Sequence, residues 1–213
     1  MKIKIQNWQI FCGLLILNLM IIWFYKECVF RYEIFYNLLK DQIDLSRIEH
    51  QVEIIRRWFD LNYLLVPVTM LFRFTFVSFI LQFPLLFILD HVPFDKIFRT
   101  VMIASLAISA GSIIQGLILF LQPIDMLDAQ TLNQIPLSLA NLVQNNGDLS
   151  NSTQMVINSF NLFEFIWCAI IYFKFKAQMI LKDVDILLLI FGVWLFFLIM
   201  QWVFIEILTL LSL

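Results

Sequence analysis

The chain has 213 residues, of which 62% are hydrophobic and 14% are charged, and its formal net charge is −2. A soluble domain of this length cannot hide so much apolar surface, so the composition predicts an integral membrane protein. Because the charges nearly balance, the chain lacks the basic surface of a nucleic-acid-binding protein, and we expect no nucleic-acid partner.

A first apolar run predicts a membrane span over residues 8–25. About 20 apolar residues suffice to cross the ~30 Å hydrocarbon core of a bilayer. The run follows a basic segment with Lys2 and Lys4, as in a signal peptide, but it is long and no small-x-small cleavage site follows it. We therefore expect an uncleaved span with Trp8 and Trp23 at the membrane interfaces.

Residues 27–60 form a polar connector whose second half has the pattern of an amphipathic helix. Ser46 precedes Glu49 by three residues, which is the spacing of a capping box. Apolar residues recur at i, i+4, i+7 and i+11, namely Ile48, Val52, Ile55 and Phe59. This periodicity predicts a helix with one apolar face. That face could lie on the lipid interface or on the rim of the helix bundle, although a solvated helical connector is slightly favoured over a lipid sensor.

Two further spans, 62–89 and 100–121, are joined by a short turn over 90–99. So short a connector requires the two spans to lie antiparallel and in contact. The loop over 123–154 contains neither Lys nor Arg, and Pro136 could open a short apolar helix within it.

A fourth span is predicted over 156–173 and, after a basic turn, a fifth over 184–210. The sequence thus predicts an all-α integral membrane protein, a single membrane domain over 1–213 with five transmembrane helices and an amphipathic helix in the first connector.

The distribution of Lys and Arg predicts the orientation of the spans. Seven of them lie on one side, in the three short basic segments at the N-terminus, at the hairpin turn and before the last span. The first connector, counted from Lys26 to residue 60, places six on the other side, but it balances them with seven acidic residues. Under the positive-inside rule this pattern predicts a cytoplasmic N-terminus, an exoplasmic C-terminus and an exoplasmic loop over 123–154.

Arg73 is the one charged residue of the second span. A guanidinium at mid-membrane costs ~2.5–3.5 kcal/mol on insertion scales, so Arg73 should face protein, water or an acidic partner. At 1.5 Å per residue it lies ~12–18 Å from the exoplasmic end of its span, and Glu164 of the fourth span lies ~7–13 Å from the same face. Gln115, Gln201 and Glu206 fall in the same half. We predict a polar cluster of these five residues, with Arg73 paired to Glu164, either as a structural ion pair or as a substrate or ion site.

Small residues recur along the third span at i, i+4, i+7 and i+11, namely Ser105, Ser109, Ser112 and Gly116. Small residues on one face let helices approach closely, and their hydroxyl groups can bond across the contact. The pattern favours a helix-packing face over a pore lining.

No motif of catalysis or metal binding occurs. Cys12, Cys28 and Cys168 form no CxxC pair, and His50 and His91 are the only histidines and form no HExxH motif. The chain also has no GxSxG sequence and no P-loop. We expect no enzymatic activity, no metal site and no cofactor.

Residues 77–121 and 158–205 resemble the Yip family (Ypt/Rab-interacting proteins), in its bacterial branch. The first match is a span, the turn Pro93-Phe94-Asp95-Lys96-Ile97-Phe98-Arg99 and a span rich in small residues. The second is SFNLFEFIW over 159–167, followed by a basic turn and an apolar run. The resemblance implies five spans with the N-terminus in the cytoplasm. In eukaryotes the family is associated with membrane trafficking and small GTPases, and for bacterial members it suggests transport or accessory roles.

These observations favour a non-catalytic inner-membrane protein that serves as an accessory or scaffold subunit of a larger membrane assembly. Its expected partners are the lipid bilayer and other membrane subunits or further copies of the chain. The alternative is a transporter or channel component with its site around Arg73 and Glu164. A composition rich in Phe, Ile and Asn fits a bacterium with low genomic GC content, which places the protein in a bacterial plasma membrane.

Overall fold

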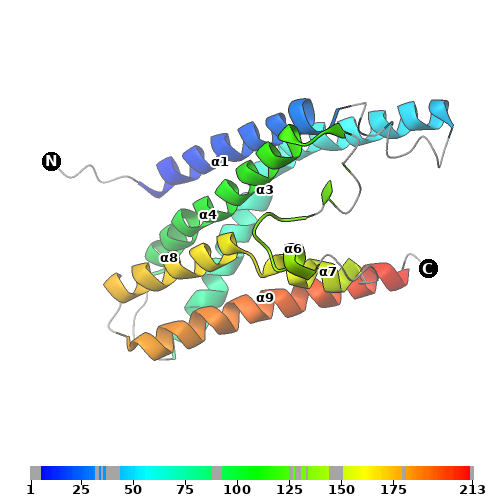
Figure 1. Cartoon of the computed structure of the whole chain (residues 1–213). Coiled ribbons are helices and arrows are strands. Elements are labelled where there is room, and N and C mark those ends of the chain that lie inside the picture. The colour runs from blue at the N-terminus through cyan, green and yellow to red at the C-terminus, as the bar shows by residue number, and fades with distance from the viewer. Residues whose placement is uncertain are drawn as a thin grey trace. The chain divides into compact units, whose positions relative to one another are not determined.

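The computed structural model describes residues 6–31, 34, 36, 44–87, 93–124, 127, 131–132, 134–143, 151–178 and 181–211. Its elements are α1 (Asn7–Phe24), the π-helix η1 (Tyr25–Val29), α3 (Leu45–Leu85), α4 (Phe94–Leu121), α6 (Ala140–Val143), α7 (Asn151–Ser159), α8 (Leu162–Gln178) and α9 (Asp183–Leu211) (Figure 1). Over the described residues the only β pairing is an isolated bridge between Ser138 and Asn161. The predicted all-α fold is confirmed for this part of the chain.

Four helices in the described part are long and apolar enough to cross a membrane: Asn7–Val29, Arg47–Leu85, Phe94–Leu121 and Asp183–Ile207. They correspond to the predicted first, second, third and fifth spans. The remaining predicted span coincides in part with α8, whose 17 residues extend only ~26 Å at 1.5 Å per residue. These helices are consistent with a multi-pass membrane protein. The fifth crossing stays a prediction.

The second half of the polar connector, residues 45–60, and the second span form one helix and not two separate elements. α3 has 41 residues, which corresponds to ~62 Å at 1.5 Å per residue. It starts after Asp44, whose carbonyl oxygen accepts bonds from the backbone N–H groups of Arg47 and Ile48. Ile48 and Val52 of the predicted apolar face are buried, so this face packs against protein. The side chain of Ser46, and with it the predicted capping box, lies outside the described residues.

The fourth predicted span is interrupted. The range 156–173 was expected to be one helix, but α7 ends at Ser159 and α8 begins at Leu162. α4 begins at Phe94, six residues before the predicted start at 100, because the chain turns into the helix directly after Pro93, whose carbonyl oxygen accepts a bond from the Lys96 N–H. α9 agrees with the predicted last span to within one residue at each end.

Contacts divide the chain into two compact units, each described here by itself. Unit 1 comprises Met1–Arg73 and Ser109–Gln134, and so holds α1, η1, the first part of α3 and the second half of α4. Its core consists of the buried residues Val29, Ile34, Leu119 and Leu127, with the partly buried Phe24, Tyr25, Phe30, Ile124 and Leu132 packed against them. This core lies where η1 meets the end of α4.

Unit 2 comprises Phe74–Ile108 and Ile135–Leu213, and so holds the end of α3, the start of α4 and α6 to α9. α8 and α9 lie side by side and antiparallel, joined by a short connector (Figure 1). The ring of Trp194 on α9 contacts Phe160 at 4.9 Å and Phe165 at 6.3 Å between centroids. Such aromatic pairs add to the area that the contact buries, and they join α9 to the start of α8.

Candidate functional site

Arg73 is exposed on α3 in the middle of its apolar stretch. Its neighbours Leu71, Phe72 and Phe76 are also exposed. The ion pairs found among the described residues, Lys26–Asp60, Arg57–Glu53 and Lys176–Asp183, do not involve Arg73. Arg73 belongs to unit 1 and Glu164 to unit 2, so the predicted pair between them stays a prediction.

Gln115 has a structural role within unit 1. It is half-buried on α4, and its side-chain amide Nε2 donates to the carbonyl oxygens of Gln134 at 3.0 Å and Leu132 at 3.4 Å. Both acceptors belong to the segment that follows α4. The amide therefore fastens this segment to the helix, a role that the sequence could not indicate because backbone acceptors leave no pattern in it.

The other three predicted cluster residues belong to unit 2. Glu164 is half-buried in the first turn of α8, and its backbone N–H donates to Oδ1 of Asn161 at 3.0 Å. A carboxylate is stabilised there by the positive end of the helix dipole. Gln201 is exposed and Glu206 half-buried on α9. Five residues of helix separate their directions by ~140° at 3.6 residues per turn, so they do not share a face.

The small residues of α4 lie at a close contact with α1 and η1 in unit 1. Asn18 Nδ2 donates to the Ser109 hydroxyl at 3.4 Å, and the Tyr25 hydroxyl donates to the carbonyl oxygen of Ser112 at 2.9 Å. Gly116 is buried, and a Cβ there would lie 3.0 Å from Cε2 of Tyr25. The predicted face thus supports helix contact at these three positions.

The fourth small residue, Ser105, is buried in unit 2, where its hydroxyl donates to the carbonyl oxygen of Val101 within the same helix. Asn18 and Tyr25, which supply the polar side of the contact in unit 1, were not identified from the sequence. Each lies in an apolar run, where a polar side chain could have been recognised as a candidate for interhelical bonding.

A buried polar cluster in unit 2 was also missed. Asn158, Ser138 and Asn161 each expose 6% or less. Asn158 Oδ1 accepts the Ser138 hydroxyl at 3.1 Å, and Asn161 Nδ2 donates to the carbonyl oxygen of Asn158 at 2.9 Å. Together with the bridge between Ser138 and Asn161, these bonds satisfy the backbone where α7 ends and α8 begins. The cluster therefore holds the chain in position at the break between α7 and α8.

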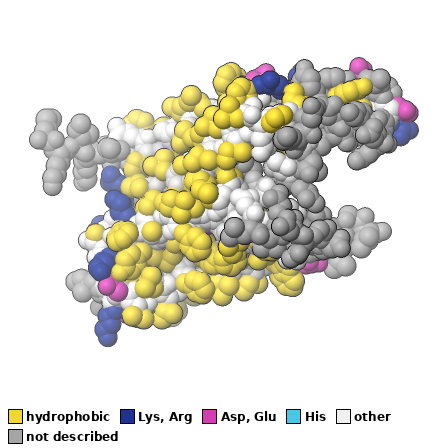
Figure 2. Space-filling view, viewed as in Figure 1, with side chains coloured by type: hydrophobic (Ala, Val, Ile, Leu, Met, Phe, Trp, Pro, Cys, Tyr) yellow, Lys and Arg dark blue, Asp and Glu magenta, His cyan; other side chains and the backbone are white. Residues whose placement is uncertain are grey.

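Charged side chains gather at the edge of the hydrophobic surface (Figure 2). The exposed charged residues of unit 2 at the ends of α4, α8 and α9 include Lys96, Lys176, Lys182 and Asp183. Lys176 Nζ donates to Asp183 Oδ2 at 2.7 Å, and this bond raises the pKa of the Lys176 ammonium group. No group of three or more His, Cys, Asp or Glu residues in the described part of the chain is placed to hold a metal ion.

Comparisons with protein-family models, with curated proteins and with solved structures found no match to this chain.

Proposed function

We propose that the chain is a non-catalytic multispanning membrane protein that acts as an accessory or scaffold subunit of a larger membrane assembly. The observation that carries the proposal is the exposure of Arg73 among exposed apolar side chains on α3. A guanidinium facing hydrocarbon costs at least ~2.5 kcal/mol, so this surface requires a protein carboxylate or another polar partner. For the assembly, the proposed carboxylate belongs to another subunit, and Glu164 of a second copy is one candidate.

The proposed topology has five crossings, with α8 as the fourth, a cytoplasmic N-terminus and an exoplasmic C-terminus in a bacterial plasma membrane. The packing of α8 against α9 supports it, because an apolar helix beside a membrane-spanning one shares its environment. A helix of ~26 Å is a few ångströms shorter than the hydrocarbon core, and local thinning of the bilayer accommodates such a mismatch at modest cost. Lys174 and Lys176 near the end of α8 can extend their ammonium groups to the interface.

The test is affinity purification of the tagged chain in mild detergent, followed by identification of the proteins that accompany it. We expect the wild type to retain one or more membrane subunits or further copies of itself, and R73Q to lose them. The matched control is R56Q, because Arg56 is an exposed cation on the same helix outside its apolar stretch. A wild-type chain that purifies alone and monodisperse would overturn the proposal, and so would equal retention by R73Q.

The transporter or channel alternative receives less support. A polar pathway around Arg73 would use the Gln115 side chain, whose amide already donates to two backbone carbonyl groups in unit 1. Within each unit, the polar contacts of the described residues are explained as structural contacts, and none of them favours a pathway for a transported solute or ion.

A further inference from the structure

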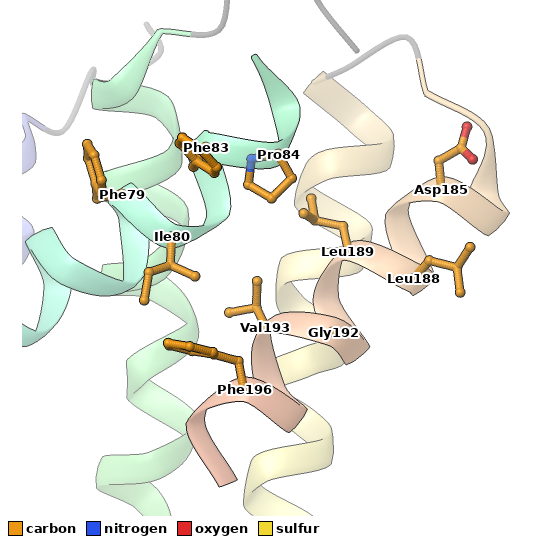
Figure 3. A pocket seen from close by; sticks show the side chains of 10 residues that line it. All are labelled: Phe79, Ile80, Phe83, Pro84, Asp185, Leu188, Leu189, Gly192, Val193 and Phe196. Carbon is orange, nitrogen blue, oxygen red and sulfur yellow. The ribbon is translucent and has the colours of Figure 1, made fainter. Parts of the chain in front are cut away.

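Unit 2 contains an apolar groove of about 730 Å³ between the last turns of α3 and the first turns of α9 (Figure 3). Phe79 and Phe83 of α3 and Leu188 and Phe196 of α9 are among its lining residues. All the lining side chains are apolar except Asp185. The volume lies within the ~300–1,000 Å³ that is usual for small-molecule sites.

The groove opens outward, and its wall has a gap at Gly192. Phe79, Phe83 and Leu188 are more than half exposed, and they lie on helices apolar enough to cross a membrane. A Cβ at Gly192 would meet nothing within 4 Å, so the missing side chain leaves open space. Hydrocarbon is therefore the medium that the groove meets.

The groove is long and lined by apolar side chains. From Asp185 to Phe196 the lining follows α9 over ~16 Å at 1.5 Å per residue. With Phe79 and Phe83 exposed along its other wall, it offers an extended apolar surface to a flexible hydrocarbon chain.

Charge at one end of the groove indicates what the chain should be attached to. Asp185 is half-buried in the first turn of α9, and none of the ion pairs found in the described part of the chain involves it. Asp183, two residues earlier in the same turn, is paired with Lys176. Exposed Lys182 precedes the same helix. A carboxylate at the groove, with a lysine three residues before it in the sequence, complements a headgroup that carries both a cation and a phosphate.

We propose that this groove binds one phospholipid, with an acyl chain along Phe83, Gly192 and Phe196 and the primary ammonium of an ethanolamine-type headgroup at Asp185. The site goes beyond the proposed scaffold function and does not depend on it. A primary ammonium can donate hydrogen bonds to the carboxylate, whereas a trimethylated one cannot. The site should therefore distinguish phosphatidylethanolamine from phosphatidylcholine as well as from phosphatidylglycerol, which has no cation.

The experiment is native mass spectrometry of the full chain after extraction from vesicles that contain equal parts of these three lipids with matched acyl chains. We expect the wild type to retain one phosphatidylethanolamine molecule with a several-fold preference over the other two. G192L, which fills the groove, should lose the retained lipid. The control is G13L, because Gly13 also lies in an apolar helix and also has nothing within 4 Å of its Cβ position.

A second pair of variants tests the headgroup. D185N should keep a bound lipid but lose the preference for phosphatidylethanolamine, whereas D183N, which changes a carboxylate in the same helical turn outside the groove, should keep the preference. Three results would overturn the proposal: equal retention of all three lipids by the wild type, unchanged lipid retention in G192L, or crosslinking of a photoreactive residue at position 83 to a partner protein instead of lipid.

Discussion

Gly116 lets the end of α1 and η1 approach α4 closely. A Cβ at this position would lie 3.0 Å from Cε2 of Tyr25 and 3.1 Å from Cε1 of Phe24. We predict that G116L destabilises the protein by ~1–3 kcal/mol, the usual cost of overpacking. The measurement is unfolding in mixed micelles with increasing SDS, followed by tryptophan fluorescence. G192L adds the same side chain in open space, so a comparable loss in both variants would show that close contact is not the cause.

The predicted pair of Arg73 and Glu164 can be tested as a double-mutant cycle. If they pair, R73Q and E164Q each leave a charge without its partner, and each should cost ~3 kcal/mol or more. The double variant should then cost about as much as either single one. The same SDS unfolding assay gives all four free energies. Additive losses would mean that the two side chains do not interact, and Arg73 would then need a partner from another subunit.

Asn158 determines, at the scale of elements, how the break between α7 and α8 is held. Its Oδ1 accepts bonds from the Ser138 hydroxyl and the Ile135 N–H. N158L removes the acceptor and leaves a buried hydroxyl unsatisfied, which should cost ~1–3 kcal/mol of unfolding free energy. N141L is the control, because exposed Asn141 bonds the Ile135 carbonyl oxygen, a group that water can satisfy. Equal stability of N158L and wild type would contradict the role of Asn158 in holding this break.

The sequence identified most of the long helices, because an uninterrupted apolar run has few alternatives to a helix. Two of its boundary errors have clear physical reasons. The break at Phe160 and Asn161 depends on two backbone bonds to residues more than twenty positions earlier: Leu139 N–H donates to the Phe160 carbonyl oxygen, and Leu162 N–H donates to the Leu137 carbonyl oxygen. No local pattern records such a tertiary contact. The predicted division of α3 near residue 61 followed a change in composition, but neither glycine nor proline stands there to end a helix.

The sequence could predict which small residues share a face of α4, but it could not predict which groups the polar side chains bond. The interval of the small residues placed Ser109, Ser112 and Gly116 on one face of α4, because helix periodicity alone determines this. The acceptors of the Gln115 amide could not be foreseen, since they are backbone carbonyl groups, which leave no pattern in the sequence. Depth in the membrane selected Glu164 as the partner of Arg73, and the pair stays a prediction because the two residues belong to different units.

At the scale of the whole molecule, the number of crossings decides where the chain ends lie. Thr153 precedes α8 and Lys182 follows it, and both are exposed. If α8 crosses the bilayer, these positions face opposite sides. In a variant with Cys12, Cys28 and Cys168 replaced by alanine, T153C should react with a membrane-impermeant maleimide in intact spheroplasts. K182C should react only after permeabilisation.

K96C supplies the reference for this experiment, because the positive-inside rule places the α3–α4 turn on the cytoplasmic side. K182C and K96C should therefore behave alike. If K182C instead reacts in intact spheroplasts as T153C does, α8 lies on the membrane or within the protein without crossing it. Four crossings would then place both chain ends on one side, and Glu164 would lose the depth that makes it a partner for Arg73. The groove would be lost as well, because four crossings place the first turns of α9 on the exoplasmic side, opposite the last turns of α3 that form its other wall.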